Sequence, residues 1–198
     1  MKKILYLTSN PLKFEIAQKA LSKCDVILEQ TNIETPEIQS LDVVEIASFS
    51  AKWASRELDK PVALTDAGYF IEALNGFPGP FIKYINKWLI SDDLLRLMKG
   101  ISNREVIVKS CLAYCEPNKE PVIFTSSISG SIAENAVKTN KGGTPINEVF
   151  IPSGYNMVES QLTKENVLEF YSKLESYWEK LAIYLSKKTD FLSQLPSQ

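Results

Sequence analysis

A short polar stretch near the N-terminus, with a lysine close behind it, has the residue types of an anion-binding loop. An apolar run ends at Leu7; Thr8, Ser9 and Asn10 come next, and Lys13 lies in the first turn of an expected helix. The first N–H groups of a helix lack partners within it, so they and the helix dipole favour an anion. We therefore expect Thr8, Ser9, Asn10 and Lys13 to bind substrate. The alternative is an ordinary turn in which Asn10 caps the helix and Lys13 is solvated.

Two acidic residues at the expected ends of strands have the chemistry to hold a metal ion opposite that loop. Glu37 lies in residues 36–40, between an expected strand and helix, and Asp66 lies in residues 64–68, after an apolar strand. Such loops converge on one crevice of an α/β sheet, and carboxylates suit Mg²⁺ that holds a polyphosphate. The pattern predicts Glu37 and Asp66 as Mg²⁺ ligands, with Asp66 also catalytic. Acidic residues at strand ends are more often solvated or capping.

The composition narrows the chemistry and the partners. The 198-residue chain has a net charge of −2, which provides no basic surplus for a nucleic-acid partner. No apolar run approaches the ~18 residues of a membrane span, so we expect no membrane partner. The sequence has no histidine, so any chemistry must run on carboxylates, lysines and a metal ion. Cys24, Cys111 and Cys115 are expected to be reduced thiols of a cytoplasmic protein.

The order of the expected elements indicates an α/β protein with a mixed sheet. Periodicity predicts helices at 11–23, 42–57, 79–98 and from 163 onward. Strands are expected at 3–8, 25–30, 61–65, 105–114, 121–126, 128–134 and 148–151. The alternation within 124–132 favours a hairpin, and strands that follow an alternating strand–helix region predict a mixed sheet. No repeat or linker divides the chain, so we expect a single domain over residues 1–198.

The C-terminal region carries apolar and aromatic residues at helical spacing. They are Leu168, Tyr171, Leu174, Tyr177, Trp178, Leu181, Tyr184, Leu185 and Phe191. Such a stripe is more often packed on the protein's own core. The alternative is a face that docks another subunit, because aromatic residues are enriched at interface cores.

In their order along the chain, these segments resemble the inosine triphosphate pyrophosphatase family. That family has a Thr-Gly-Asn-x-x-Lys loop like residues 8–13, a Pro-Glu-x-Gln-like turn like residues 36–39, and an Ala-Leu-x-Gly-x-Pro-Gly segment like residues 73–79. Residues 124–133 and 150–155 are similar to its later strand pair and its Phe-x-Pro-x-Gly-Tyr turn. The resemblance spans residues 3 to about 170.

The resemblance implies an elongated α/β fold in two lobes, with a nucleotide in the cleft between them. It also implies a homodimer, and a Mg²⁺-dependent activity that hydrolyses (deoxy)inosine or xanthosine triphosphate to the monophosphate and pyrophosphate. We therefore expect a mixed sheet in two lobes, a purine nucleoside triphosphate as ligand and Mg²⁺ as cofactor.

Several positions depart from the family's pattern. Thr65 replaces the first of two adjacent acids, and Ser50 stands where the family has a lysine, with Lys52 two residues further on. The base-binding loop reads Thr-Pro-Ile-Asn-Glu at 144–148, without its stacking aromatic residue and aspartate. The run at 164–171 lacks the family's lysine, histidine and arginine.

These departures favour a subunit that binds dITP or ITP with Mg²⁺ but hydrolyses it weakly. Such a subunit would act as a sensor in antiphage defence, licensing a partner effector such as a sirtuin-like NAD-hydrolase that docks on the C-terminal helix. The alternative is an active pyrophosphatase in which Asn147 reads the base and Lys52 or Lys141 replaces the lost cations. A third hypothesis is a structural partner that binds no nucleotide.

Overall fold

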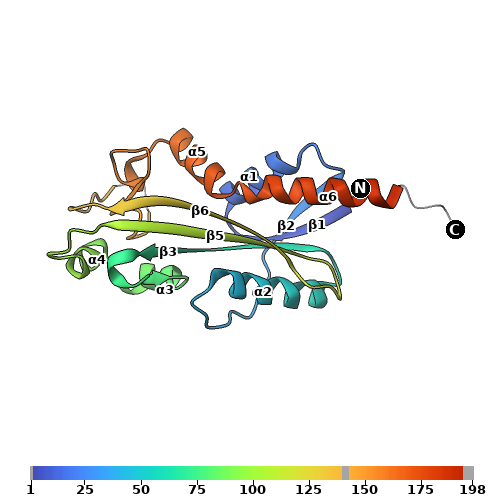
Figure 1. Cartoon of the computed structure of the whole chain (residues 1–198), viewed down its shortest axis with the longest axis horizontal. Coiled ribbons are helices and arrows are strands. Elements are labelled where there is room, and N and C mark those ends of the chain that lie inside the picture. Colours follow the sequence, from blue (N-terminus) through green and yellow to red (C-terminus); the bar gives the residue numbers. More distant parts are fainter. Residues whose placement is uncertain (1, 140–142, 194–198) are drawn as a thin grey trace.

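The protein has a mixed sheet covered by helices on both faces, and it is elongated along the longest strands (Figure 1). A computed structural model describes residues 2–139 and 143–193, and for residues 188–193 it describes the backbone alone. The strands are β1 (Lys2–Leu7), β2 (Val26–Thr31), β3 (Val62–Ile71), β4 (Pro78–Gly79), β5 (Glu105–Cys115), β6 (Val122–Ile132) and β7 (Phe150–Pro152). The helices are α1 (Pro11–Leu21), α2 (Val43–Leu58), α3 (Ile82–Trp88), α4 (Ser91–Leu97), α5 (Lys164–Leu174) and α6 (Tyr177–Ser193). Short 3₁₀ turns occur at Glu72–Leu74 and Glu159–Gln161.

The sheet changes from parallel to antiparallel at β3. Its strand order is β2-β1-β3-β5-β6-β7, with β4 paired beside β3. β1 pairs in parallel with β2 and β3, whereas β3, β5, β6 and β7 pair antiparallel in sequence. The last β1–β3 pair is Leu7 with Leu64, and β4 joins β3 only at Tyr69 and Phe70. The mixed sheet expected from the sequence is thus confirmed, and β3 has an open edge between its two neighbours.

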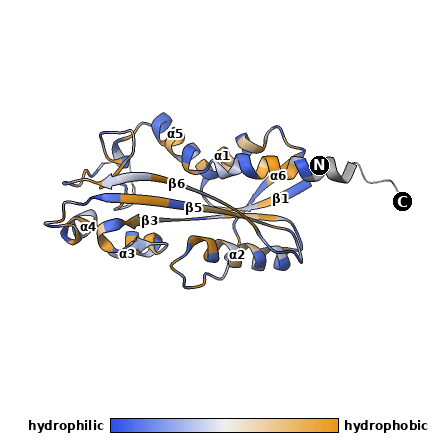
Figure 2. Cartoon of the chain, in the orientation of Figure 1, coloured by the Kyte–Doolittle hydropathy of each residue, from blue (hydrophilic) through white to orange (hydrophobic). Residues whose placement is uncertain are grey.

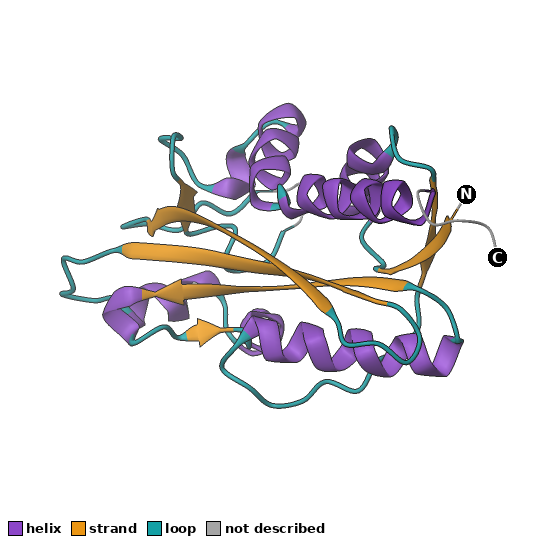
Figure 3. Cartoon of the chain, turned by 45° about the vertical axis from the view of Figure 1, so that its right-hand side comes forward, coloured by secondary structure: helices purple, strands orange, loops and turns teal. Residues whose placement is uncertain are grey.

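Helices cover this sheet on both faces (Figures 1 and 3). The buried hydrophobic side chains form separate clusters. One cluster joins β1 to α1 and α6, and includes Ile4, Tyr6 and Trp178. Another lies on the opposite face, where α2 packs on β1, β3 and β5. Figure 2 shows hydrophobic residues gathered along the central strands and on the helices that cover them. Burial of these side chains is the main force that joins the layers.

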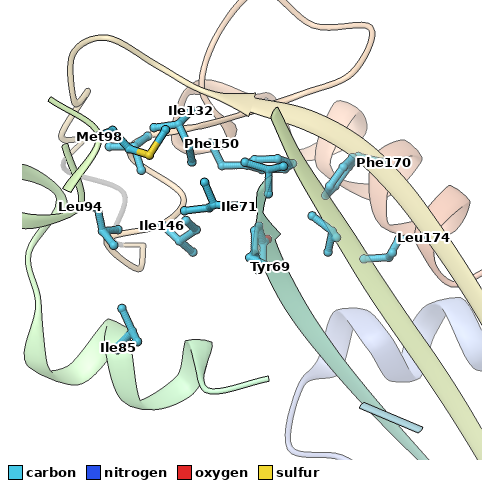
Figure 4. Close-up of a cluster of buried hydrophobic side chains, with 13 residues drawn as sticks. Tyr69, Ile71, Ile85, Leu94, Met98, Ile132, Ile146, Phe150, Phe170 and Leu174 are labelled. Atoms are coloured by element: carbon cyan, nitrogen blue, oxygen red, sulfur yellow. The ribbon is translucent and has the colours of Figure 1, made fainter. Parts of the chain in front are cut away.

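A further cluster fills the other end of the molecule, where β3, α3, α4, β7 and α5 meet (Figure 4). Tyr69 and Phe150 meet edge to face there, with ring centroids 5.1 Å apart, and Phe170 packs beside Phe150. This cluster forms the core of a second lobe, so the molecule has the two lobes that the family resemblance implies. No helix among the described residues is long and apolar enough to span a membrane.

Three expected elements differ from the structure. The helix expected at 79–98 is two short helices, because the backbone is extended at Leu89 and Ile90 and the Asp93 carboxylate accepts the Ile90 N–H. The hairpin expected within 124–132 is one continuous strand, β6, whose alternation reflects its two faces. Asp66 lies inside the ten-residue strand β3, not after a strand.

The aromatic stripe near the C-terminus packs on the protein's own core. Tyr177, Trp178 and Leu181 are fully buried. The rings of Trp178 and Tyr6 meet edge to face, with their centroids 4.8 Å apart. These buried side chains stabilise the fold and are not exposed for the docking of an effector, which the sequence suggested for this stripe. Phe191 lies outside the described side chains.

Candidate functional site

A cavity of about 1000 Å³ opens where β1 ends and β3 continues. Its walls come from the β1–α1 loop, the segment between β2 and α2, the middle of β3, and the β4–α3 region. Six of the predicted site residues line it together: Thr8, Ser9, Asn10, Lys13, Glu37 and Asp66. The open edge of β3 explains this convergence, because the absent β1 neighbour leaves space beside Asp66.

The β1–α1 loop forms one wall and is fixed by local hydrogen bonds. The Asn10 Oδ1 accepts the N–H groups of Leu12 at 2.9 Å and Lys13 at 3.4 Å, and Pro11 occupies the first helical position. Thr8 Oγ1 accepts the Asn10 N–H at 3.1 Å. The capping role expected of Asn10 is thus confirmed. Two helix N–H groups are already paired, so the hydroxyls and Lys13 are the groups this loop offers to an anion.

Lys13 is held within the protein and is not a solvated surface lysine. Its side chain is only 23% exposed, and its Nζ lies 3.5 Å from Thr65 Oγ1 and 3.9 Å from Glu175 Oε1. Thr65 Oγ1 in turn lies 2.9 Å from the Tyr6 hydroxyl. The ammonium group is therefore fixed in the cavity wall, between a strand and the C-terminal helices.

The two carboxylates of the cavity have different environments. Burial raises the pKa of Asp66 to about 6, although the Ala67 N–H donated to its Oδ1 and the charge of Lys13 oppose this rise. Glu37 is half-exposed, and the hydrogen bond from Lys83 holds the pKa of its carboxyl below the usual range. The Lys83 Nζ lies 2.8 Å from Glu37 Oε1, and the Tyr84 hydroxyl donates to Oε2 at 3.2 Å. Two side chains of α3 thus hold the Glu37 carboxylate in place by hydrogen bonds.

These groups suit a hard divalent cation bound together with phosphate. Glu37 and Asp66 are oxygen donors, and Mg²⁺ in nucleotide sites is usually held by one or two carboxylates plus phosphate oxygens and water. Among the described residues, no group of three or more histidine, cysteine, aspartate or glutamate side chains could hold a metal by itself. The donor set therefore fits a Mg²⁺ ion that arrives with a polyphosphate better than an ion bound by protein alone.

Lys52 and Asn147 do not line the cavity. Ser50 does, and its Oγ donates to the Pro36 carbonyl at 3.3 Å, whereas Lys52, about 200° further around α2, forms an ion pair with Glu120. Asn147 Oδ1 accepts the Thr144 N–H at 3.0 Å and so orders its own turn. Lys141 lies outside the described residues.

Sequence reasoning missed several cavity residues and the buried Glu175. Among the missed cavity residues are Lys83, Tyr84 and Trp88 of α3, and Phe77, which directly precedes β4. Trp88 is 73% exposed, and its ring lies 5.7 Å from that of Tyr84. The available signal was the position of Lys83, which directly follows the Gly-Pro-Phe-Ile run at the start of α3.

Comparison with known proteins gives concordant matches. The model of the Ham1 family matches residues 4–171. Curated dITP/XTP pyrophosphatases of Methanopyrus kandleri and Thermococcus kodakarensis are each 36% identical over 163 residues, which is 82% of this chain and 86% of theirs. The fold is that of a Ham1 protein from Coxiella burnetii, with a TM-score of 0.78 at 21% identity, covering 94% of this chain and 100% of that one. A Ham1 protein from Staphylococcus aureus gives a TM-score of 0.76 at 20% identity, with the same coverage.

Proposed function

The chain belongs to the Ham1 family, and from this premise we propose that it is a Mg²⁺-dependent pyrophosphatase of purine nucleoside triphosphates such as dITP and XTP. The observation that carries the proposal is the single cavity in which Lys13 and the β1–α1 loop face Asp66 and Glu37. A lysine and carboxylates that can hold a metal ion are recurring parts of sites that cleave a metal–triphosphate. The names of the relatives supply the substrate class.

Each group has a role in this proposal. Lys13 and the hydroxyls of Thr8 and Ser9 bind the phosphate tail, because an ammonium and hydroxyl donors form charge-assisted hydrogen bonds with phosphate oxygens. Asp66 and Glu37 hold the Mg²⁺, which when bound neutralises charge on the phosphates. Water attacks the α-phosphorus, and the bond from the α-phosphorus to the oxygen that it shares with the β-phosphorus breaks. The products are the nucleoside monophosphate and pyrophosphate.

The catalytically weak sensor that the sequence favoured has no support among the relatives. The relatives from Methanopyrus kandleri and Thermococcus kodakarensis are named as dITP/XTP pyrophosphatases, and neither name mentions a defence system or an effector. The active enzyme, the sequence's alternative, therefore replaces it as the proposal. The homodimer implied by the resemblance stays a prediction, which sedimentation of the purified chain tests.

Pyrophosphate release from dITP and XTP with Mg²⁺ tests the proposed function. Asp66→Asn should lower the rate by about 10²-fold or more, since loss of one group that stabilises transition-state charge has this effect. The matched control is Asp92→Asn on α4, a half-exposed residue paired with Lys138, which should retain the wild-type rate. Absence of pyrophosphate release from every purine triphosphate by the wild-type chain would contradict the proposal.

A further inference from the structure

A carboxylate is buried behind Lys13, at the junction of α5 and α6. The Glu175 side chain is 1% exposed, and the Trp178 indole N–H donates to its Oε2 at 3.3 Å. Its other oxygen, Oε1, lies 3.9 Å from the Lys13 Nζ. Glu175 lies four residues beyond Tyr171, the last residue that the family model matches.

Such a group needs an explanation, because a buried carboxylate costs stability unless an opposite charge compensates it. Lys13 is the cation with which Glu175 forms an ion pair among the described residues. Lys13 is also the cation of the β1–α1 loop in the cavity. The charge that compensates Glu175 is thus the Lys13 ammonium, the same group that we expect to contact a ligand in the cavity.

The surroundings of the pair restrict where the ammonium can lie. Thr65 Oγ1 contacts Nζ from the β3 side, while Glu175 contacts it from the helical side. Buried side chains hold both partners in place. The Tyr6 hydroxyl lies 2.9 Å from Thr65 Oγ1, and the Tyr6 ring packs against Trp178, whose indole N–H donates to Glu175. A long lysine side chain otherwise has many rotamers, and fixing one before binding lowers the entropy cost of the complex.

We propose that Glu175 is a positioning residue that holds the Lys13 ammonium in the cavity wall, where it contacts the phosphate tail of the nucleotide. The inference rests on the proposed function only in that Lys13 binds a polyphosphate. Glu175 touches neither nucleotide nor metal and acts through Lys13. The C-terminal helices therefore contribute to ligand affinity, although they lie outside the cavity lining.

A double-mutant cycle tests this coupling. Glu175→Gln keeps the shape and an oxygen that accepts the Trp178 N–H, but it removes the charge. We expect it to weaken binding of the α,β-imido analogue of dITP by about 10-fold, as for loss of a buried charge partner, and to change dIMP binding less than about 2-fold. In a Lys13→Met background the same change should have no further effect, because the two residues act as a unit.

The controls separate positioning from a structural role. Glu169→Gln on α5 removes an exposed carboxylate that pairs with Lys173, and it should leave both affinities unchanged. Glu175→Asp keeps the charge but has a shorter side chain, so we expect an intermediate loss of affinity for the triphosphate analogue. This variant replaces Glu175→Gln if Glu175→Gln does not fold. The unfolding midpoint of each variant is measured alongside.

Three results would overturn the inference: tighter triphosphate binding by Glu175→Gln, equal losses for triphosphate and monophosphate, or an undiminished effect in Lys13→Met. The binding assay uses an analogue that is not cleaved, so its result is independent of turnover. A chain that shows the coupling but releases no pyrophosphate contradicts the proposed function alone. A chain that releases pyrophosphate without the coupling contradicts this inference alone.

Discussion

At the scale of single residues, the charge balance around Lys13 dominates the site. Its ammonium lies near Thr65 and Glu175, and its charge opposes the rise that burial causes in the pKa of Asp66. One side chain therefore influences the phosphate loop, the expected metal ligand and the buried carboxylate. A neutral residue at this position should affect ligand binding more than any other single change in the loop.

Lys13→Met should weaken binding of the triphosphate analogue by about 10- to 150-fold, because a hydrogen bond to a charged group contributes ~1.5–3 kcal/mol. Titration calorimetry with the α,β-imido analogue of dITP, beside dIMP, measures the change. The monophosphate should lose much less affinity. Equal losses for both ligands would mean that Lys13 does not contact the phosphate tail.

Glu175 should make stability depend on pH in a direction that its burial fixes. Burial raises the pKa of its carboxyl from the usual 4.5 to about 6, although Lys13 opposes this rise. The native state therefore binds the proton more tightly than the unfolded chain. The stabilisation from this uptake is fully present below about pH 4.5 and is lost as the pH rises through about 6.

The free energy of unfolding of wild type relative to Glu175→Gln should thus fall by about 2 kcal/mol between pH 4 and pH 7.5. Urea unfolding across that pH range measures it. Glu169→Gln is the control of opposite sign, because Lys173 lowers the pKa of the exposed Glu169 carboxyl. A flat difference for Glu175 would show that its carboxyl has the same pKa in both states.

At the scale of elements, the site depends on where strands end. β3 continues for several residues beyond its last pair with β1, and β4 pairs with it only at Tyr69 and Phe70. The cavity therefore lies beside an unpaired edge of β3. α3 follows β4 and carries Lys83 and Tyr84, which hold Glu37. The distance between β3 and β4 therefore sets the position of an expected metal ligand.

Gly68→Ala should disturb this arrangement. A Cβ on Gly68 would lie 2.7 Å from the backbone carbon and oxygen of Gly79 in β4, closer than real Cβ contacts, so β4 must shift. We expect a loss of about 1–3 kcal/mol in the free energy of unfolding, as for overpacked sites, and weaker nucleotide binding. Gly143→Ala is the control, because its Cβ would meet other described residues only at 3.9 Å and beyond. Wild-type stability in Gly68→Ala would contradict the close approach.

At the scale of the whole molecule, α6 closes one lobe and supports the site from behind. Trp178 is fully buried between Tyr6 of β1 and Glu175, so the C-terminal helix joins the sheet core to the ion pair of Lys13. The helix that the sequence suggested as a docking surface thus belongs to the core.

Trp178 and Trp88, two of the three tryptophans, provide a direct comparison. Trp178→Ala should lower the free energy of unfolding by about 3–5 kcal/mol, because it leaves a large cavity in the core. Trp88→Ala on α3 should change it by less than about 1 kcal/mol, since that side chain is 73% exposed. Chemical unfolding of both variants measures the difference. Similar small losses for both would show that α6 is not part of the cooperative core.

The sequence by itself determined the features that depend on local patterns. Alternation and helical periodicity indicated the mixed sheet, and the order Asn10-Pro11 indicated the start of α1, because capping chemistry involves residues close in the chain. Glu37 and Asp66 line one cavity, as expected from the sequence, but Asp66 reaches it from within β3, beyond the end of β1, and not from the end of a strand. Lys52 and Asn147 were selected by alignment of motifs, and the structure places both elsewhere.

Only the tertiary structure decided the contacts between distant segments. The Glu175–Lys13 pair, the Lys83–Glu37 pair and the burial of Trp178 each join elements far apart in the sequence. A periodic pattern reports that a helix has an apolar face but not what covers that face, so the sequence favoured core packing of α6 and left an interface open as the alternative. Packing settled this point, because burying the stripe on the chain's own sheet removes its apolar surface from water without a partner.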